Sequence, residues 1–255
     1  MTNQPQTTPE TLTDAQIAYY RQNGFVHIPG IVSKDEAAHY YEAALDLSKR
    51  RKDDGGGNIF TQLVNVWRHD DAMRPLTLHA NLAAVAQRVA GVKLRLWHDH
   101  ILIKQPHNKA PTEFHQDQPY WPHANSQHPI SAWIALCDVP VESGCMSFIP
   151  GSFDHRDLVG QDLSDPRSLF SVCSELRWSP RVTLPLRAGD CTFHHGRCAH
   201  MATPNITDNP RVAHVVIFMD ATTTYDGKRH IVTDPLGLTV GELIEGELFP
   251  MVDSS

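Results

Sequence analysis

From Lys93 onward the chain consists of short β-type runs separated by turn signals, and this pattern constrains the fold most strongly. Three of the turn signals are Ser143-Gly144, Pro150-Gly151 and Ala188-Gly189-Asp190. Several short strands with regular turn signals are typical of an all-β sandwich or barrel. We therefore expect a mainly β fold with a double-sheet core. The expected strands lie at residues 93–104, 130–139, 145–149, 181–187, 190–195 and 211–220.

The residues before Lys93 carry helix signals instead. Thr13-Asp14-Ala15-Gln16 and Ser33-Lys34-Asp35-Glu36 are capping boxes, in which a side chain at each end satisfies the first free N–H groups of a helix. Asn81 is expected to be the N-cap of a third helix. These segments predict helices that flank the β core, with short strands at 25–29 and 59–67.

The length of 255 residues is compatible with one β domain. Residues 1–11 are expected to form a flexible N-terminal tail, and residues 12–255 a single domain. Residues 152–180 show no hydrophobic period. Because a connection of this length in a compact domain is usually functional or disordered, we expect a lid there.

Charge and cysteine content exclude several classes of protein. Twenty-two basic and 29 acidic residues give a net charge of −7, which disfavours nucleic-acid binding. No apolar run is long enough for a membrane helix, and the N-terminal residues do not resemble a secretory signal. The five cysteines contain no CxxC motif, which indicates a reducing compartment, so a cytoplasmic location is expected.

The chain has 16 histidines, and one of them stands in Phe114-His115-Gln116-Asp117. In an extended chain, residues two apart point to the same face, so His115 and Asp117 are positioned to bind one cation. Taken alone, this tripeptide is a weak signal, because such sequences also arise at surfaces by chance.

A second segment, Gly189 to His200, runs through a strand and brings a histidine to its end. Arg211 follows eleven residues later and opens another strand. Turn-forming residues lie between them, so His200 and Arg211 are expected on consecutive strands of a hairpin, facing one cavity.

Two histidines and one carboxylate on one face of a metal leave three positions open. This arrangement suits Fe(II) that binds both a chelating cosubstrate and O2. A buried arginine supplies a fixed fork for a distant carboxylate. 2-Oxoglutarate meets both requirements, because it chelates through its C1 carboxylate and keto oxygen and carries a second carboxylate at C5.

The ordered set His115-Gln116-Asp117, Trp133, His200 and Arg211 resembles the phytanoyl-CoA dioxygenase family of Fe(II)/2-oxoglutarate oxygenases. The resemblance covers residues 12 to 220. It includes the opening Leu12-Thr13-Asp14-Ala15-Gln16, the segment 23–29, and Asp138 to Ser152. It implies a double-stranded β-helix, a cupin-like jelly roll, with iron at one mouth.

The resemblance also implies roles for individual residues. His115, Asp117 and His200 would bind the iron, and Arg211 would bind the C5 carboxylate. His194 and His195 compete with His200, but the family's spacing to Arg211 favours His200. Residues expected around the cosubstrate are Trp133 and Gln116, with Lys104, Gln62 and Asn65 as further candidates.

Other residues remain open from the sequence. Tyr120 and Trp121 are expected either to pack at the rim or to contact substrate. His98, His100 and His107 either lie in solvent or border the pocket. The sequence departs from the family where Ala202 stands in place of a frequent serine.

The expected reaction is hydroxylation, or another oxidation at a C–H bond, of a small-molecule metabolite, with release of succinate and CO2. Asp117 argues against halogenation, because related halogenases replace this carboxylate with a small residue. Two alternatives stay open: a jelly-roll metalloenzyme that does not use 2-oxoglutarate, and a non-catalytic binding module. The substrate and the oligomeric state are not readable from the sequence.

Overall fold

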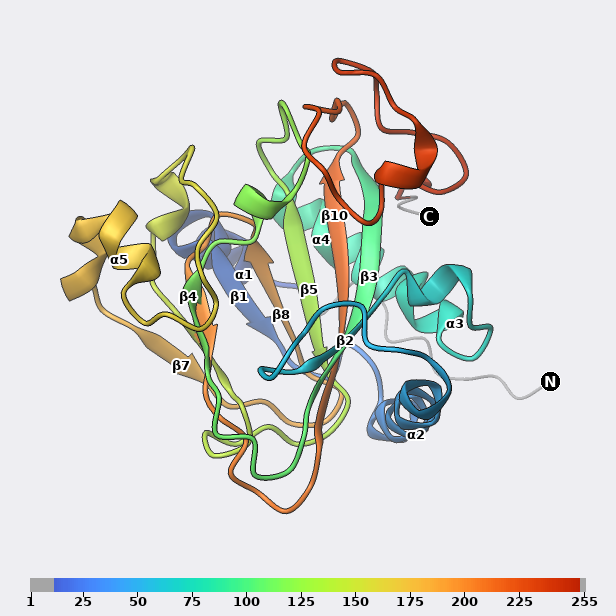
Figure 1. Cartoon of the computed structure of the whole chain (residues 1–255), viewed down its shortest axis with the longest axis vertical. Helices are drawn as coiled ribbons and strands as arrows, with labels where there is room; N and C mark the ends of the chain where they lie inside the picture. The colour runs from blue at the N-terminus through green and yellow to red at the C-terminus, as the bar shows by residue number, and fades with distance from the viewer. Residues whose placement is uncertain (1–11, 253–255) are drawn as a thin grey trace.

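Two antiparallel sheets enclose a cavity in the structure, a computed structural model that describes residues 12–252 (Figure 1). The expected tail, 1–11, lies outside the described residues. The six-stranded sheet has the order β1 (Phe25–Ile28), β8 (Cys191–His195), β5 (Ile130–Ala135), β10 (Arg211–Asp220), β3 (Leu94–Lys104) and β2 (Thr61–Val64). The four-stranded sheet has the order β4 (Thr112–His115), β9 (His200–Ala202), β6 (Met146–Phe148) and β7 (Val182–Leu184).

Helices cover the outer face of the six-stranded sheet. α1 (Asp14–Asn23) contacts β1, α2 (Lys34–Arg50) contacts β10, and α4 (Ala80–Ala90) contacts β5. Figure 1 shows α2 and α4 on the side of β10 and β3. The shorter helices are α3 (Arg74–Thr77), α5 (Ser168–Val172), and the 3-10 helices η2 (Val66–Arg68), η3 (Gln118–Tyr120), η4 (Ser152–Asp154), η5 (Ser174–Trp178) and η6 (Asp234–Leu236).

The capping boxes at Thr13 and Ser33 are present in the structure, as predicted. The predicted cap at Asn81 is wrong. His79 is the N-cap of α4, and its Nδ1 accepts from the backbone N–H of Asn81 at 3.2 Å. A histidine ring nitrogen thus takes the place of the usual hydroxyl, carboxylate or amide oxygen.

Strand β10 shows why the strands of this sheet have mostly apolar sequences without alternation. Val212 and Val216 pack into the core cluster shared with the helices, whereas Ala213, Val215 and Ile217 belong to the cluster on the inner side. Because successive strand residues point to opposite faces, a sheet covered on both sides buries every residue. All ten residues of β10 are buried.

The expected hairpin between His200 and Arg211 is wrong. β9, which begins at His200, belongs to the four-stranded sheet, and β10, which begins at Arg211, belongs to the six-stranded sheet. The chain crosses between the sheets through residues 203–210. The Asn205 amide stabilises this crossing by donating to the carbonyls of Lys104, Gln105 and Asn209.

The prediction of a mainly β fold with flanking helices is confirmed. The strand expected at 59–67 is shorter, because Asn65 has a φ of 56° and ends it. Residues 152–180 contain η4, α5 and η5, and a lid role for them stays a prediction. Within the described range, no helix combines the length and the apolar character needed to span a bilayer.

Candidate active site

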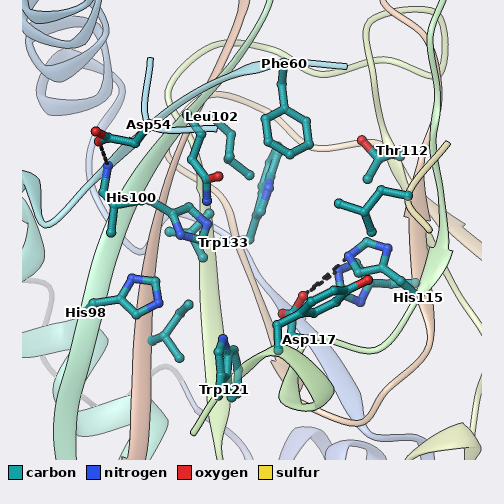
Figure 2. Close-up of a pocket in the computed structure, with 18 of the residues that line it drawn as sticks. Asp54, Phe60, His98, His100, Leu102, Thr112, His115, Asp117, Trp121 and Trp133 are labelled. Carbon is teal, nitrogen blue, oxygen red and sulfur yellow. Dashed lines mark hydrogen bonds and ion pairs between the residues drawn. The ribbon is translucent and has the colours of Figure 1, made fainter. Parts of the chain in front are cut away.

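The cavity between the sheets has a volume of about 300 Å³, and both sheets contribute to its wall (Figure 2). His115 and His200 come from the four-stranded sheet. Trp133 and Arg211 come from the six-stranded sheet. His200 and Arg211 therefore face the same cavity as expected, but from opposite walls.

His115, Asp117 and His200 form the one group in the described part of the chain that could hold a metal ion. One ligand atom from each lies within 4.8 Å of the others. The Oδ1 atom of Asp117 is 3.4 Å from Nε2 of His115 and 3.7 Å from Nε2 of His200. His115 and His200 are direct partners in the β4–β9 ladder, and Asp117 follows where β4 gives way to η3.

Backbone contacts set which ring nitrogen faces the centre of this group. Nδ1 of His115 lies 2.7 Å from the carbonyl of Glu113, and Nδ1 of His200 lies 3.0 Å from that of Cys198. A carbonyl only accepts, so each Nδ1 carries the hydrogen and each Nε2 offers a lone pair. Burial lowers the pKa of His200 to about 3, against the opposing effect of Asp117, so this ring is neutral and able to bind metal.

Asp117 is ionised. Burial alone would raise its pKa, but His200, followed by His115 and His194, holds the pKa well below its usual value. Two imidazole nitrogens and one carboxylate oxygen form the donor set that non-heme Fe(II) takes while keeping positions open. The residues present therefore fit the metal that the sequence predicts.

Arg211 lies on the cavity wall without a carboxylate partner within the described residues. It is 2% exposed, and its Nε has no hydrogen-bond partner. Its Nη1 is 3.4 Å from the carbonyl of Leu102, and its Cζ lies 5.3 Å from the centroid of the Trp133 ring. Burial lowers the pKa of Arg211 to about 10, which leaves it charged at neutral pH. A buried, unpaired guanidinium fits a carboxylate ligand.

Lys104 is the ladder partner of Arg211 and is fully buried. It does not line the cavity, and its Nζ donates to the carbonyl of Ala110 at 2.8 Å. Gly144, with a φ of +88°, keeps space beside the side chains of Arg211 and Lys104. A Cβ there would lie 3.1 Å from Nε of Arg211 and 3.1 Å from Cδ of Lys104. Two basic side chains therefore meet at this end of the molecule.

The other predicted cosubstrate residues separate into two groups. Trp133 and Gln62 line the cavity. Gln116 and Asn65 do not, which corrects the expectation for them. Gln116 directly follows the last residue of β4. Its amide donates to carbonyls of Ser152, His155 and Arg197.

Tyr120 and Trp121 both line the cavity. The Tyr120 hydroxyl donates to the carbonyl of Gln161, which ties the cavity rim to the 152–180 segment. Ala202 also lines the cavity, but the neighbouring Thr203 does not, because its hydroxyl donates to the carbonyl of Val141 at 2.6 Å. Thr203 thus does not replace the serine frequent in relatives.

Sequence reasoning did not assign roles to several residues of the cavity. Ser131 and His194 contact Asp117 from β5 and β8, and His230 lines the wall from a segment after β10. Alternate residues of a strand share a face, and in β3 residues 98, 100 and 102 all line the cavity, with Lys104 on the same face. This two-residue spacing could have identified His98 and His100 as cavity residues. No comparable pattern pointed to His230.

The model of the phytanoyl-CoA dioxygenase (PhyH) family matches residues 20–213. The chain belongs to the phytanoyl-CoA dioxygenase family. It is 30% identical over 163 residues to phytanoyl-CoA dioxygenase domain-containing protein 1 of Mus musculus. The match covers 61% of this chain and 55% of the mouse protein, so the chain spans about half the length of such curated relatives.

Two solved structures resemble this family member over nearly their whole length. SnoK, a non-heme alpha ketoglutarate dependent carbocyclase from nogalamycin biosynthesis, has a TM-score of 0.87 and 38% identity, with 97% of this chain and 99% of that chain covered. The epimerase SnoN, in complex with Fe3+, alpha ketoglutarate and nogalamycin RO, has a TM-score of 0.80 and 36% identity, with 94% and 98% covered. The predicted family and jelly-roll fold are confirmed, and both solved relatives are named as alpha ketoglutarate enzymes or complexes, SnoN with Fe3+ bound.

Proposed function

We propose that this chain is an Fe(II)/2-oxoglutarate-dependent oxygenase that oxidises a C–H bond of a small-molecule metabolite. One observation carries the proposal. A converging His115–Asp117–His200 donor set and the unpaired guanidinium of Arg211 lie on opposite walls of one cavity. A metal site alone would not require the buried cation, and an anion site alone would not require the three ligands.

In this proposal each side chain has one task. His115 and His200 bind iron through Nε2, and Asp117 binds it through Oδ1. Arg211 binds the C5 carboxylate of 2-oxoglutarate in a place where water is excluded, which strengthens the charge pair. Trp133 lies against the guanidinium and limits the orientations open to it.

When bound, iron and 2-oxoglutarate supply the oxidising power that activates O2 and removes hydrogen from the substrate, with release of succinate and CO2. The protein holds the reacting C–H bond near the metal ligands and shields it from water. Tyr120 and Trp121 are proposed to contact the substrate at the rim. Because SnoK is a carbocyclase and SnoN an epimerase, ring closure and epimerisation are proposed beside hydroxylation as outcomes.

The test is anaerobic difference absorption of metal-free protein after addition of Fe(II) and then 2-oxoglutarate. A visible charge-transfer band is expected only when both are present. Arg211→Ala should retain Fe(II) binding and weaken 2-oxoglutarate binding about 30- to 5000-fold, because loss of one partner of a buried charge pair costs ~2–5 kcal/mol. Arg187→Ala, which removes an exposed arginine, is the matched control.

Unchanged 2-oxoglutarate affinity in Arg211→Ala would contradict the assignment of Arg211 to the C5 carboxylate. Metal binding without the band would point to a jelly-roll metalloenzyme that does not use 2-oxoglutarate. No metal binding at all would favour the non-catalytic module. The cytoplasmic location expected from the cysteine pattern stays a prediction.

A further inference from the structure

One wall of the cavity carries histidines that the iron and cosubstrate assignments do not use. His98 and His100 belong to β3, and His230 lies in the segment between β10 and η6. All three line the cavity. In Figure 2, His98 and His100 project from β3 into the cavity on the side opposite His115. The ring centroid of His98 lies 5.4 Å from that of His100 and 5.6 Å from that of His230.

The strand register relates this histidine wall (His98, His100 and His230) to the metal site. His98 pairs with Ile217 of β10, and Ile217 pairs with Ser131 of β5. Ser131 in turn donates to Asp117. Neighbouring strands are ~4.8 Å apart, so His98 lies about 10 Å from Ser131 across the sheet. A ligand bound at His98 therefore lies over Ile217, with its other end near the metal ligands.

Two of these rings offer complementary hydrogen-bonding atoms. Nδ1 of His98 lies 3.2 Å from the carbonyl of Asp99, so it carries the hydrogen, and the buried Nε2 is an acceptor without a partner. Nδ1 of His230 accepts from the backbone N–H of Val232 at 3.2 Å, so in the neutral ring Nε2 carries the hydrogen and donates. Two rings whose centroids lie 5.6 Å apart thus offer one acceptor and one donor to the cavity. A hydroxyl group, which both donates and accepts, satisfies both.

The histidine wall carries no fixed charge at neutral pH. Burial lowers the pKa of His98 well below its usual value and lowers the pKa of His230 to about 4, so both rings are neutral. Of the described residues that line the cavity, Arg211 is the one cation, and the proposed function assigns it to 2-oxoglutarate. An anionic substrate would therefore find no counter-charge here. Burying an unpaired anion is costly.

The surfaces beside the histidine wall are apolar. Trp121, Val215, Ile217 and Ile231 line the same cavity. The indole of Trp121 is flat and the other three side chains are aliphatic, which favours an apolar ring as the body of the ligand.

We propose that the histidine wall is the substrate subsite and binds a hydroxyl group of a neutral, hydroxyl-bearing ring compound, whose ring lies over Ile217. The inference rests on the proposed function and adds a substrate class to it. It places the reacting C–H bond on the part of the molecule farthest from that hydroxyl.

The test measures binding of three naphthalenes that differ at one position: 2-naphthol, 2-methoxynaphthalene and 2-naphthoate. Each is titrated by calorimetry into the protein loaded with Mn(II) and 2-oxoglutarate, which does not turn over. 2-Naphthol is expected to bind at least tenfold more tightly than the ether, which lacks the donor, and than the anion. His98→Leu and, separately, His230→Phe should reduce this preference to near unity.

His107→Leu is the matched control, because the His107 side chain is 65% exposed and lies outside the cavity. Strongest binding of the naphthoate, equal binding of the ether, or no measurable binding of any of the three overturns the inference. An unchanged preference in both variants also overturns it.

The same titrations without Mn(II) and 2-oxoglutarate separate the two proposals. If the cosubstrate assignment fails, 2-oxoglutarate does not bind, but the naphthol preference and its dependence on His98 persist. If the substrate subsite is wrong, 2-oxoglutarate binds and the preference is absent. Retention of the iron- and 2-oxoglutarate-dependent band in His98→Leu shows that this variant is folded.

Discussion

The Ser131 hydroxyl donates to Oδ2 of Asp117 at 3.1 Å, on the side of the carboxylate that faces away from the candidate metal ligands. Nε2 of His194 lies 3.5 Å from the same oxygen. The other oxygen, Oδ1, is the one that faces His115 and His200. Asp117 is therefore oriented so that one oxygen is available to a metal and the other is held by the six-stranded sheet.

Ser131→Ala removes the shorter of the two contacts to Oδ2. Residues that orient a metal ligand typically change metal affinity 10- to 100-fold. We expect Mn(II) affinity to fall within about this range, measured by titration of metal-free protein. Thr192→Val is the control, since it removes another buried hydroxyl from the same sheet, one that does not contact Asp117. Equal losses in the two variants would indicate a general effect on packing.

Metal binding should stabilise the folded chain, because the three ligands converge in the folded state only. At a Mn(II) concentration about 100 times the dissociation constant, mass action contributes ~2.7 kcal/mol, a rise in Tm of roughly 5–10 °C for a chain of this size. EDTA should reverse the rise, and His115→Ala should abolish it. His107→Ala, which truncates an exposed histidine, should keep it. A Tm unaffected by Mn(II) in the unaltered protein contradicts the metal site.

The lowered pKa of Lys104 leads us to expect that proton uptake on 2-oxoglutarate binding depends on pH. Burial and the neighbouring Arg211 lower its pKa to about 7, so above this pH most molecules carry a neutral amine. A bound carboxylate nearby favours the charged ammonium and raises the pKa. Binding of 2-oxoglutarate at pH 8 should therefore take up protons, and at pH 6, where Lys104 is already charged, it should not.

Calorimetry in two buffers with different ionisation enthalpies measures this uptake. Lys104→Met should abolish it, whereas Lys109→Met, at an exposed position, should not. The same uptake in Lys104→Met would show that the proton goes elsewhere.

The sequence predicted those parts of the fold whose signals are local. The bounds of β10 agree with the expected run 211–220, because burial on both faces makes residues 212–219 apolar except for His214. The short strands β4 and β9 were not predicted as separate strands, and His200 was placed at the end of the strand that follows Gly189. Three or four residues that include Thr112, His115 and His200 carry no hydrophobic period that would delimit them. Turn-forming residues at 203–210 could not distinguish a hairpin from a crossing between sheets, since both need the same turn chemistry.

The residues of the candidate site were likewise predicted only in part from the sequence. The resemblance to the family assigned His115, Asp117, His200 and Arg211 to one site, and the structure places all four on one cavity. The side chain of Gln116 lies outside the cavity lining because its amide donates to carbonyls of distant segments, which no local pattern indicates. His230 comes from a segment without regular strand structure, so no periodicity could place it on the wall.

The Arg211 guanidinium lies over the ring of Trp133, so we expect this ring to affect 2-oxoglutarate binding. A cation over an aromatic face gains ~0.5–2 kcal/mol, more where water is excluded. Trp133→Leu keeps an apolar side chain but removes that face, so 2-oxoglutarate affinity should fall about 2- to 30-fold with Mn(II) affinity nearly unchanged. Trp178→Leu, at a tryptophan that is 88% exposed, should change neither. If Trp133→Leu weakens Mn(II) and 2-oxoglutarate binding equally, the ring supports the whole cavity and not the guanidinium alone.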